Sequence, residues 1–170
     1  EGGQAQSWAG FIQQPHYENY FLGIDEAHWG AGCGVFGEVL LKDVWPGIDL
    51  RISGKDGIKY DLIVAPGANA NAIRMRYEGH DGMEVKDGAL HVRLSTGEVV
   101  EEAPLTKVNR EWPWGVETME IPSSYVVEGN ALHFHLCGRP PIRSGAFCLQ
   151  SGDEIIIDPV LTFGSYSGST

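Results

Sequence analysis

Apolar and polar residues alternate along much of this chain, and that alternation restricts its fold more than any other feature. Tyr60, Leu62 and Val64, for example, alternate with Lys59 and Asp61. The same alternation recurs in the segments 49–53, 59–64, 73–78, 90–94 and 132–136. Consecutive side chains on a β-strand point to opposite faces, so each segment has one apolar and one polar face. The pattern predicts antiparallel strands with one buried face, since parallel strands covered on both faces are apolar throughout.

Short turn sequences separate the predicted strands. Asp56-Gly57, Asp87-Gly88 and Gly129-Asn130 each lie between two alternating segments, and Thr96-Gly97 follows a further one. Such residue pairs tolerate the positive φ angles that two-residue hairpin turns need. The turns therefore predict hairpins between strands that are neighbours in the sequence.

The predicted fold is all-β, an antiparallel two-sheet β-sandwich-like domain, with a β-barrel as the alternative. The segment Tyr17–His28 has aromatic residues at helical spacing, and we expect at most one short helix there. The length of 170 residues suits one domain, so residues 1–170 are predicted to form a single β-rich unit. Residues Gly164–Thr170 are interpreted as an exit toward a following module.

The charge of the chain argues against two classes of partner. Lys and Arg number 12 against 23 Asp and Glu, which gives a formal net charge of −11. An acidic surface repels phosphate backbones, so nucleic acid is not an expected partner. Apolar runs such as Ile155–Ile157 are far shorter than the ~20 residues that cross a bilayer, so no membrane span is expected.

Several stretches, taken in order, are similar to one bacterial protein family. They are Asn19–Gly23 followed by Trp29, then Val44–Leu50, Tyr60–Ala68, Ile73–Gly79 and Ile157–Leu161. Their order resembles an uncharacterised domain that precedes seven-bladed β-propeller (SBBP) repeats or immunoglobulin-like modules in large exported bacterial surface proteins. The resemblance covers residues 19–166, and it implies an extracellular or cell-surface location. It assigns no catalytic residue.

The resemblance also implies partners. Members of that family carry further strands before the segment that matches Asn19, whereas only Glu1–Glu18 precede it here. We therefore expect an open sheet edge that pairs with a strand from the same exported assembly, supplied by another module or another chain. The segments Glu111–Pro122 and Cys137–Cys148 depart from the family pattern, so the chain is interpreted as a fragment or a shortened relative.

The principal functional prediction is a non-enzymatic β-domain with a structural, assembly or adhesion role in an exported bacterial surface protein. The first alternative is a carbohydrate- or protein-binding module that uses an aromatic platform. Trp112 and Trp114 are separated by the rigid Pro113, and two such rings can stack on a glycan or anchor a protein partner. Packing of both tryptophans against a sheet is the ordinary interpretation.

The second alternative is a metal-dependent or acid/base hydrolase. His133 and His135 share one face of a predicted strand, so both can reach one metal ion. A third ligand would have to come from His91, Glu128 or His80, and two solvent-facing histidines are the ordinary interpretation.

Acidic residues provide weaker candidates. Asp81, Asp87 and Asp56 carry oxygen ligands suitable for calcium, but their spacing is not that of an EF-hand, and Asp-Gly is first a turn sequence. The adjacent acids Glu101-Glu102 and Asp153-Glu154 point to opposite faces of a strand, so we predict solvated charges and not catalytic pairs. Calcium is the one cofactor that the sequence leaves open.

The three cysteines do not define a redox state. Cys137 and Cys148 are close enough in sequence to close a short loop, which would leave Cys33 unpaired. Buried free thiols explain the same residues equally well. No Cys-x-x-Cys pair is present, which argues against a structural zinc knuckle.

Overall fold

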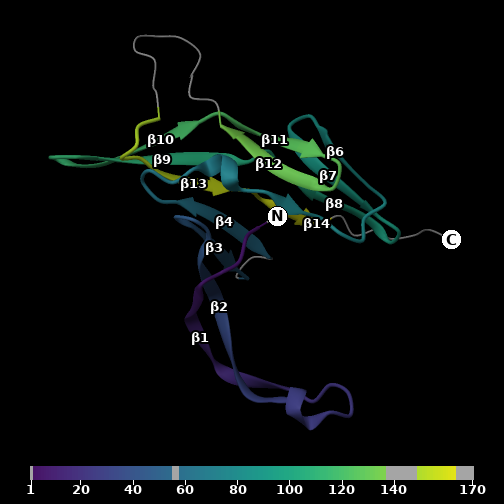
Figure 1. The fold of residues 1–170 in the computed structure, drawn as a ribbon. Helices are drawn as coiled ribbons and strands as arrows, with labels where there is room; N and C mark the ends of the chain where they lie inside the picture. Colours follow the sequence, from purple (N-terminus) through teal and green to yellow (C-terminus); the bar gives the residue numbers. More distant parts are fainter. Residues whose placement is uncertain (1, 55–57, 137–148, 164–170) are drawn as a thin grey trace.

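The structure, a computed structural model, describes residues 2–54, 58–136 and 149–163 and consists of three antiparallel sheets (Figure 1). The largest sheet has seven strands, in the spatial order β1 (Ser7–Tyr20), β2 (Gly30–Trp45), β3 (Ile48–Ser53), β4 (Lys59–Val64), β13 (Glu154–Asp158), β9 (Leu105–Trp112) and β10 (Gly115–Ile121). The second has the order β11 (Ser123–Glu128), β12 (Ala131–Leu136) and β5 (Met75–Arg76). The third has the order β14 (Leu161–Phe163), β8 (Gly97–Glu101), β7 (Ala89–Leu94) and β6 (Gly82–Lys86).

The predicted all-β, sandwich-like fold is confirmed, with the strands divided over three sheets. Every strand pair in the described residues is antiparallel, and each sheet ends in two edge strands. The described strands therefore form no closed barrel, and the barrel alternative is wrong. Strand β10 passes into the second sheet at Pro122, and β13 passes toward the third at Pro159. Proline has no backbone N–H for a ladder, so it ends one sheet where the next begins.

One apolar core joins the three sheets, and it is built from the faces that the alternation predicts. Leu62 and Val64 of the large sheet are fully buried, as are Leu90 of the third sheet and Leu132 of the second. The remaining buried apolar residues are Trp45, Ile48, Ile73, Val92, Val108, Ile121, Tyr125, Phe134, Ile155 and Ile157. These side chains line the space between the sheets, which is the layered arrangement expected of a sandwich.

The turns behave largely as predicted. Asp87 and Gly88, between β6 and β7, have φ angles of 52° and 87°, the positive pair that a type I′ hairpin turn requires. Gly129 has φ of 64° between β11 and β12. A further tight turn, Pro46-Gly47, joins β2 to β3. Asp56-Gly57 lies outside the described residues.

The expectation of at most one short helix over Tyr17–His28 is confirmed, with the helix confined to the end of the segment. Residues as far as Tyr20 belong to β1, because they pair with β2, and Tyr20 lies opposite Gly30. The helical content of this segment is the three-residue 3-10 turn η1 (Glu26–His28), whose first turn is capped by the Asp25 side chain. The other helical element in the described residues is η2 (Ala70–Ala72).

A buried carboxylate links the three sheets. Glu101, at the end of β8, is 2% exposed and accepts hydrogen bonds from three tyrosine hydroxyls. Tyr60 of β4 donates to Oε2 at 2.9 Å, and Tyr77, next to β5, donates to Oε1 at 2.6 Å. Tyr125 of β11 lies 3.4 Å from Oε2 and donates to the Glu102 carbonyl at 2.9 Å. The prediction of a solvated Glu101 is wrong, whereas Glu102 is exposed.

Replacing Glu101 by alanine is expected to destabilise the protein strongly. The change removes the acceptor of the buried tyrosine hydroxyls, and each buried donor left without a partner costs about 1–3 kcal/mol. We expect Glu101→Ala to lower the free energy of unfolding by more than about 2 kcal/mol, measured by chemical denaturation. The matched control is Glu102→Ala, which removes an exposed side chain and should cost below about 0.5 kcal/mol. Equal losses for the two variants would contradict the linking role of Glu101.

The same cluster predicts an alkaline transition. Burial is the main cause that raises the pKa of Tyr60, Tyr77 and Tyr125, and the Glu101 carboxylate raises the pKa of each of them further. A raised pKa in the folded state stabilises the fold below the ordinary tyrosine pKa of about 10, and this contribution is lost as the pH rises further. The free energy of unfolding should therefore fall above about pH 10.

The measurement is an ultraviolet titration of tyrosinate followed beside circular dichroism. We expect a step of tyrosinate absorbance that coincides with unfolding. Tyr77→Phe should shrink that step, and Tyr17→Phe, at a side chain 64% exposed, should not. Ionisation of all tyrosines well before unfolding would show that the cluster does not hold the hydroxyls protonated.

Candidate functional site

A long hairpin projects from the large sheet and exposes apolar side chains along its length (Figure 1). We call residues 7–37, which comprise β1, the tip and the first part of β2, the arm. Its exposed large apolar residues, with exposed fractions from 38% to 102%, are Trp8, Phe11, Ile12, Tyr17, Tyr20, Phe21, Leu22, Ile24 and Trp29. Contiguous apolar surface of this kind marks interaction sites on soluble proteins.

Aromatic contacts within the arm give it a defined shape, although no second sheet among the described residues packs against it. Phe21 and Trp29 meet edge to face at the tip, with ring centroids 5.4 Å apart, and the Trp29 indole donates to the Gly23 carbonyl at 3.3 Å. Nearer the root, the Phe36 ring lies so close to Gly10 that a Cβ there would come within 2.5 Å of it. Glycine at this position therefore lets the two strands approach.

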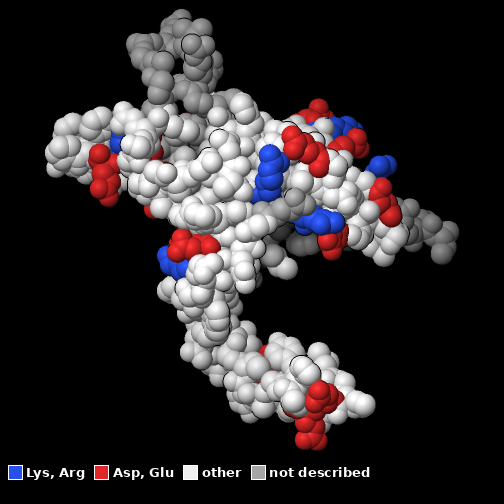
Figure 2. All heavy atoms as spheres, in the orientation of Figure 1, with Lys and Arg blue, Asp and Glu red and all other residues white. Residues whose placement is uncertain are grey.

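Charge on the arm is concentrated at its ends. Figure 2 shows a mostly uncharged surface between a charged cluster near the root and acidic atoms at the tip. Asp25 and Glu26 lie at the tip, Glu18 lies close to it on β1, and just beyond the root Lys42 pairs with Asp49, with their charged atoms 2.6 Å apart. The surface between them offers apolar contact and little electrostatic attraction.

The two tryptophans of the predicted aromatic platform come together at a second protrusion, the tip of the β9–β10 hairpin. The Trp112 and Trp114 rings are stacked, with centroids 5.2 Å apart and planes 7° apart. Trp114 is 80% exposed and Trp112 is 38% exposed. The Trp112 indole donates to Glu117 Oε2 at 3.0 Å, which fixes the orientation of the ring. Packing of both rings against a sheet, the ordinary interpretation, does not hold for Trp114.

The predicted metal ligands do not assemble. His133 is half-buried, with Nδ1 3.3 Å from an Arg74 guanidinium nitrogen, and the same guanidinium lies 3.1 Å from Glu128. A cation between these two candidate ligands disfavours a metal ion there. His135 lies on the same strand and is exposed. Within the described residues, no group of three or more His, Cys, Asp or Glu side chains is placed to hold a metal.

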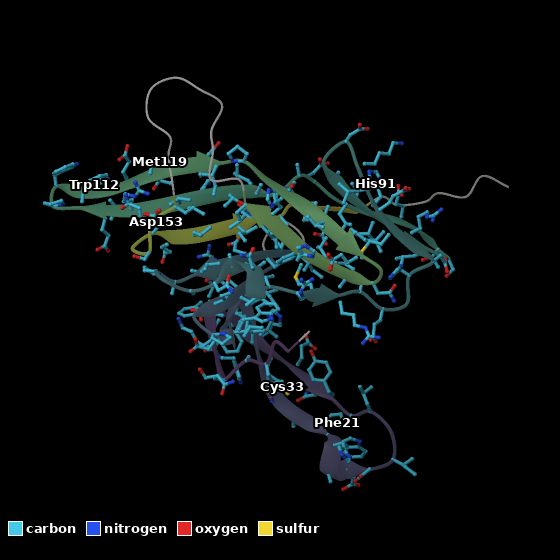
Figure 3. All side chains as sticks on the ribbon, turned by 45° about the horizontal axis from the view of Figure 1, so that its top comes forward. Phe21, Cys33, His91, Trp112, Met119 and Asp153 are labelled. Carbon is cyan, nitrogen blue, oxygen red and sulfur yellow. The ribbon has the colours of Figure 1, made fainter. Side chains whose placement is uncertain are left out.

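The other candidate third ligands lie elsewhere. His91, on β7 of the third sheet, has Nδ1 3.3 Å from Glu98 (Figure 3). His80 lies just before β6, with both ring nitrogens buried and without a hydrogen-bond partner in the structure.

The calcium candidates are also separated. Asp81 and Asp87 stand at opposite ends of β6, so a five-residue strand lies between them. Asp56 lies outside the described residues. Calcium binding by these three aspartates has no geometric support among the described positions.

The second acidic pair contains another buried carboxylate. Asp153 is 3% exposed, and its two oxygens accept from the Arg110 guanidinium at 2.7 and 2.8 Å and from the Gln150 backbone at 2.8 Å. The Arg110 hydrogen bond holds the pKa of Asp153 below its ordinary value. The prediction of a solvated pair is therefore wrong for Asp153, because its partner lies 43 residues away in sequence.

Cys33 is a half-buried free thiol on β2. Cys137 and Cys148 lie outside the described residues. The pairing of these two cysteines stays a prediction.

The fold and these surfaces define a class: an open all-β domain with an apolar arm at one end and a stacked tryptophan pair at the other. The chain belongs to the family described as domain of unknown function (DUF7948), whose model matches residues 3–160. No curated protein and no solved structure matches the chain significantly. Within the described residues, no helix has the length and apolar character needed to cross a membrane.

Proposed function

We propose that this chain is a non-enzymatic β-domain of an exported bacterial surface protein, and that it joins a neighbouring module or chain through its arm. The exposed apolar arm is the observation that carries the proposal. Its side chains are those enriched at the centres of protein interfaces, namely aromatic and large aliphatic residues. Covering them would stabilise an assembly by roughly 25 cal/mol for each Å² of apolar surface removed from water.

The arm has the geometry of a docking element. Its tip lies away from the core that joins the three sheets, so its apolar surface is available to a second molecule or module (Figure 1). An isolated two-stranded ribbon is only marginally stable in water, which favours a partner that covers it. Strand β1 also has one neighbour, β2, in the described part of the sheet, and its other edge can accept a strand.

The proposed export and surface location are supported by other observations than the proposed docking through the arm. The ordered resemblance to domains that precede SBBP repeats or immunoglobulin-like modules implies an exported parent protein. A net charge of −11 favours solubility outside the cell, which is a colloidal argument and not a folding one. The metal-dependent hydrolase alternative has no group of three or more candidate ligands placed to hold a metal among the described residues.

Site-specific photocrosslinking in the full-length parent protein tests this function. A photoreactive phenylalanine analogue replaces Ile24 at the arm tip, and in a control protein it replaces Val85 of β6, which is 40% exposed. We expect the Ile24 position to crosslink to one defined segment of a neighbouring module or chain on intact cells, because that tip would be buried in the assembly. The Val85 position should give little product.

Two results would overturn the proposal. One is an Ile24 position that yields no more product than Val85 in the intact protein. The other is a parent protein that resists external protease on intact cells and is digested only after lysis.

A further inference from the structure

One face of the β9–β10 hairpin carries a row of side chains suited to a different ligand. Arg110 lies opposite Glu117 and Val108 opposite Met119, while Trp112 lies opposite Gly115. Residues directly opposite in an antiparallel pair share a face, and so do residues two apart on one strand. Trp112, Arg110 and Glu117 therefore line the same face of the hairpin.

The row continues from the hairpin to a cavity in the body of the protein. The Arg110 guanidinium binds the Asp153 carboxylate, and Asp153 lines a cavity of about 330 Å³. Asn69, Asn71 and Gln150 belong to the same lining. Figure 3 places Trp112, Met119 and Asp153 at one end of the large sheet, away from Phe21 on the arm. The tryptophan pair, the Arg110–Asp153 ion pair and the cavity lining therefore lie along one continuous surface path.

We propose that this path, from Trp114 past Glu117 to the cavity beside Asp153, binds a neutral hexopyranose oligosaccharide. The outer face of the Trp114 indole offers a flat apolar surface to the C–H face of a sugar ring. The Trp112 indole stacks on the inner face of Trp114 and supports its orientation. A carboxylate such as Glu117 accepts hydrogen bonds from sugar hydroxyls, and amide groups both accept and donate them. Such a mixture of apolar platform and few polar groups is typical of small-ligand sites.

The charge of the path selects uncharged sugars. Glu117 lies on the path, and the positive charge of the Arg110 guanidinium is engaged in a two-point ion pair with Asp153. A polyanionic glycan would meet net negative charge in an acidic protein, so uronates and sulfated sugars are disfavoured. The path uses other residues than the proposed arm-mediated contact, and they lie at another end of the molecule.

Isothermal titration calorimetry of the intact chain tests the site with named probes. The neutral probes are cellohexaose, β-1,4-mannohexaose and chitohexaose, and the anionic probe is a hexagalacturonate. We expect at least one neutral probe to bind more tightly than hexagalacturonate. Trp114→Ala should weaken that binding by about tenfold or more, because the platform ring is lost. Glu117→Gln should weaken it less, because the amide keeps a hydrogen-bonding oxygen.

The matched control is Trp8→Ala, which removes a tryptophan 64% exposed on the arm and should leave sugar binding unchanged. Circular dichroism of each variant establishes that it is folded. The proposal is overturned if no neutral probe binds at about 10 mM, if Trp114→Ala binds as well as the unaltered chain, or if hexagalacturonate binds more tightly. Trp114→Ala in the parent protein should keep the Ile24 crosslink, so failure of the sugar site and failure of the arm function are separate results.

Discussion

The arrangement of the three sheets depends on one buried carboxylate. Desolvating Glu101 is unfavourable unless its oxygens accept hydrogen bonds, and the structure provides three hydroxyls, from Tyr60, Tyr77 and Tyr125. Apolar contacts between sheets have no preferred direction, whereas these hydrogen bonds do. The cluster therefore selects one relative placement of the sheets from the many that would bury the same apolar area.

With the sheets fixed in this way, two hairpins extend beyond the core, and their surfaces differ. The arm exposes apolar residues with few charges, a surface suited to a protein partner. The β9–β10 hairpin instead holds Trp112 and Trp114 beside Glu117, Arg110 and Asp153, a surface suited to a hydroxyl-rich ligand. Because the hairpins lie at different ends of the large sheet, one molecule can use both surfaces together.

The alternation of apolar and polar residues predicted the strands that have one solvent-exposed face and one buried face. Strands such as 59–64 and 132–136 alternate because their inner faces meet the core. The strands of the arm could not be predicted in the same way. Neither face of the arm is covered, so its residues do not alternate, and Pro15 also interrupts the pattern. The burial of Glu101 and Asp153 could not be predicted, because their hydrogen-bond partners come from strands distant in the sequence. The proximity of Trp112 and Trp114 could be predicted, because the two residues are neighbours across one tight turn.

The backbone of the arm is strained at Ile12. Ile12 has φ of 57°, a left-handed conformation that is unfavourable by about 1–2 kcal/mol for an L-residue and more so for a branched one. Gly37 stands beside it, where a Cβ would lie 3.3 Å from the Ile12 side chain. The β1–β2 register is the same on both sides of Ile12, with Phe11 opposite Glu38 and Gln13 opposite Phe36, and Ile12 is 65% exposed. If the arm docks on a neighbouring module as proposed, burial of Ile12 against that module would offset part of this cost.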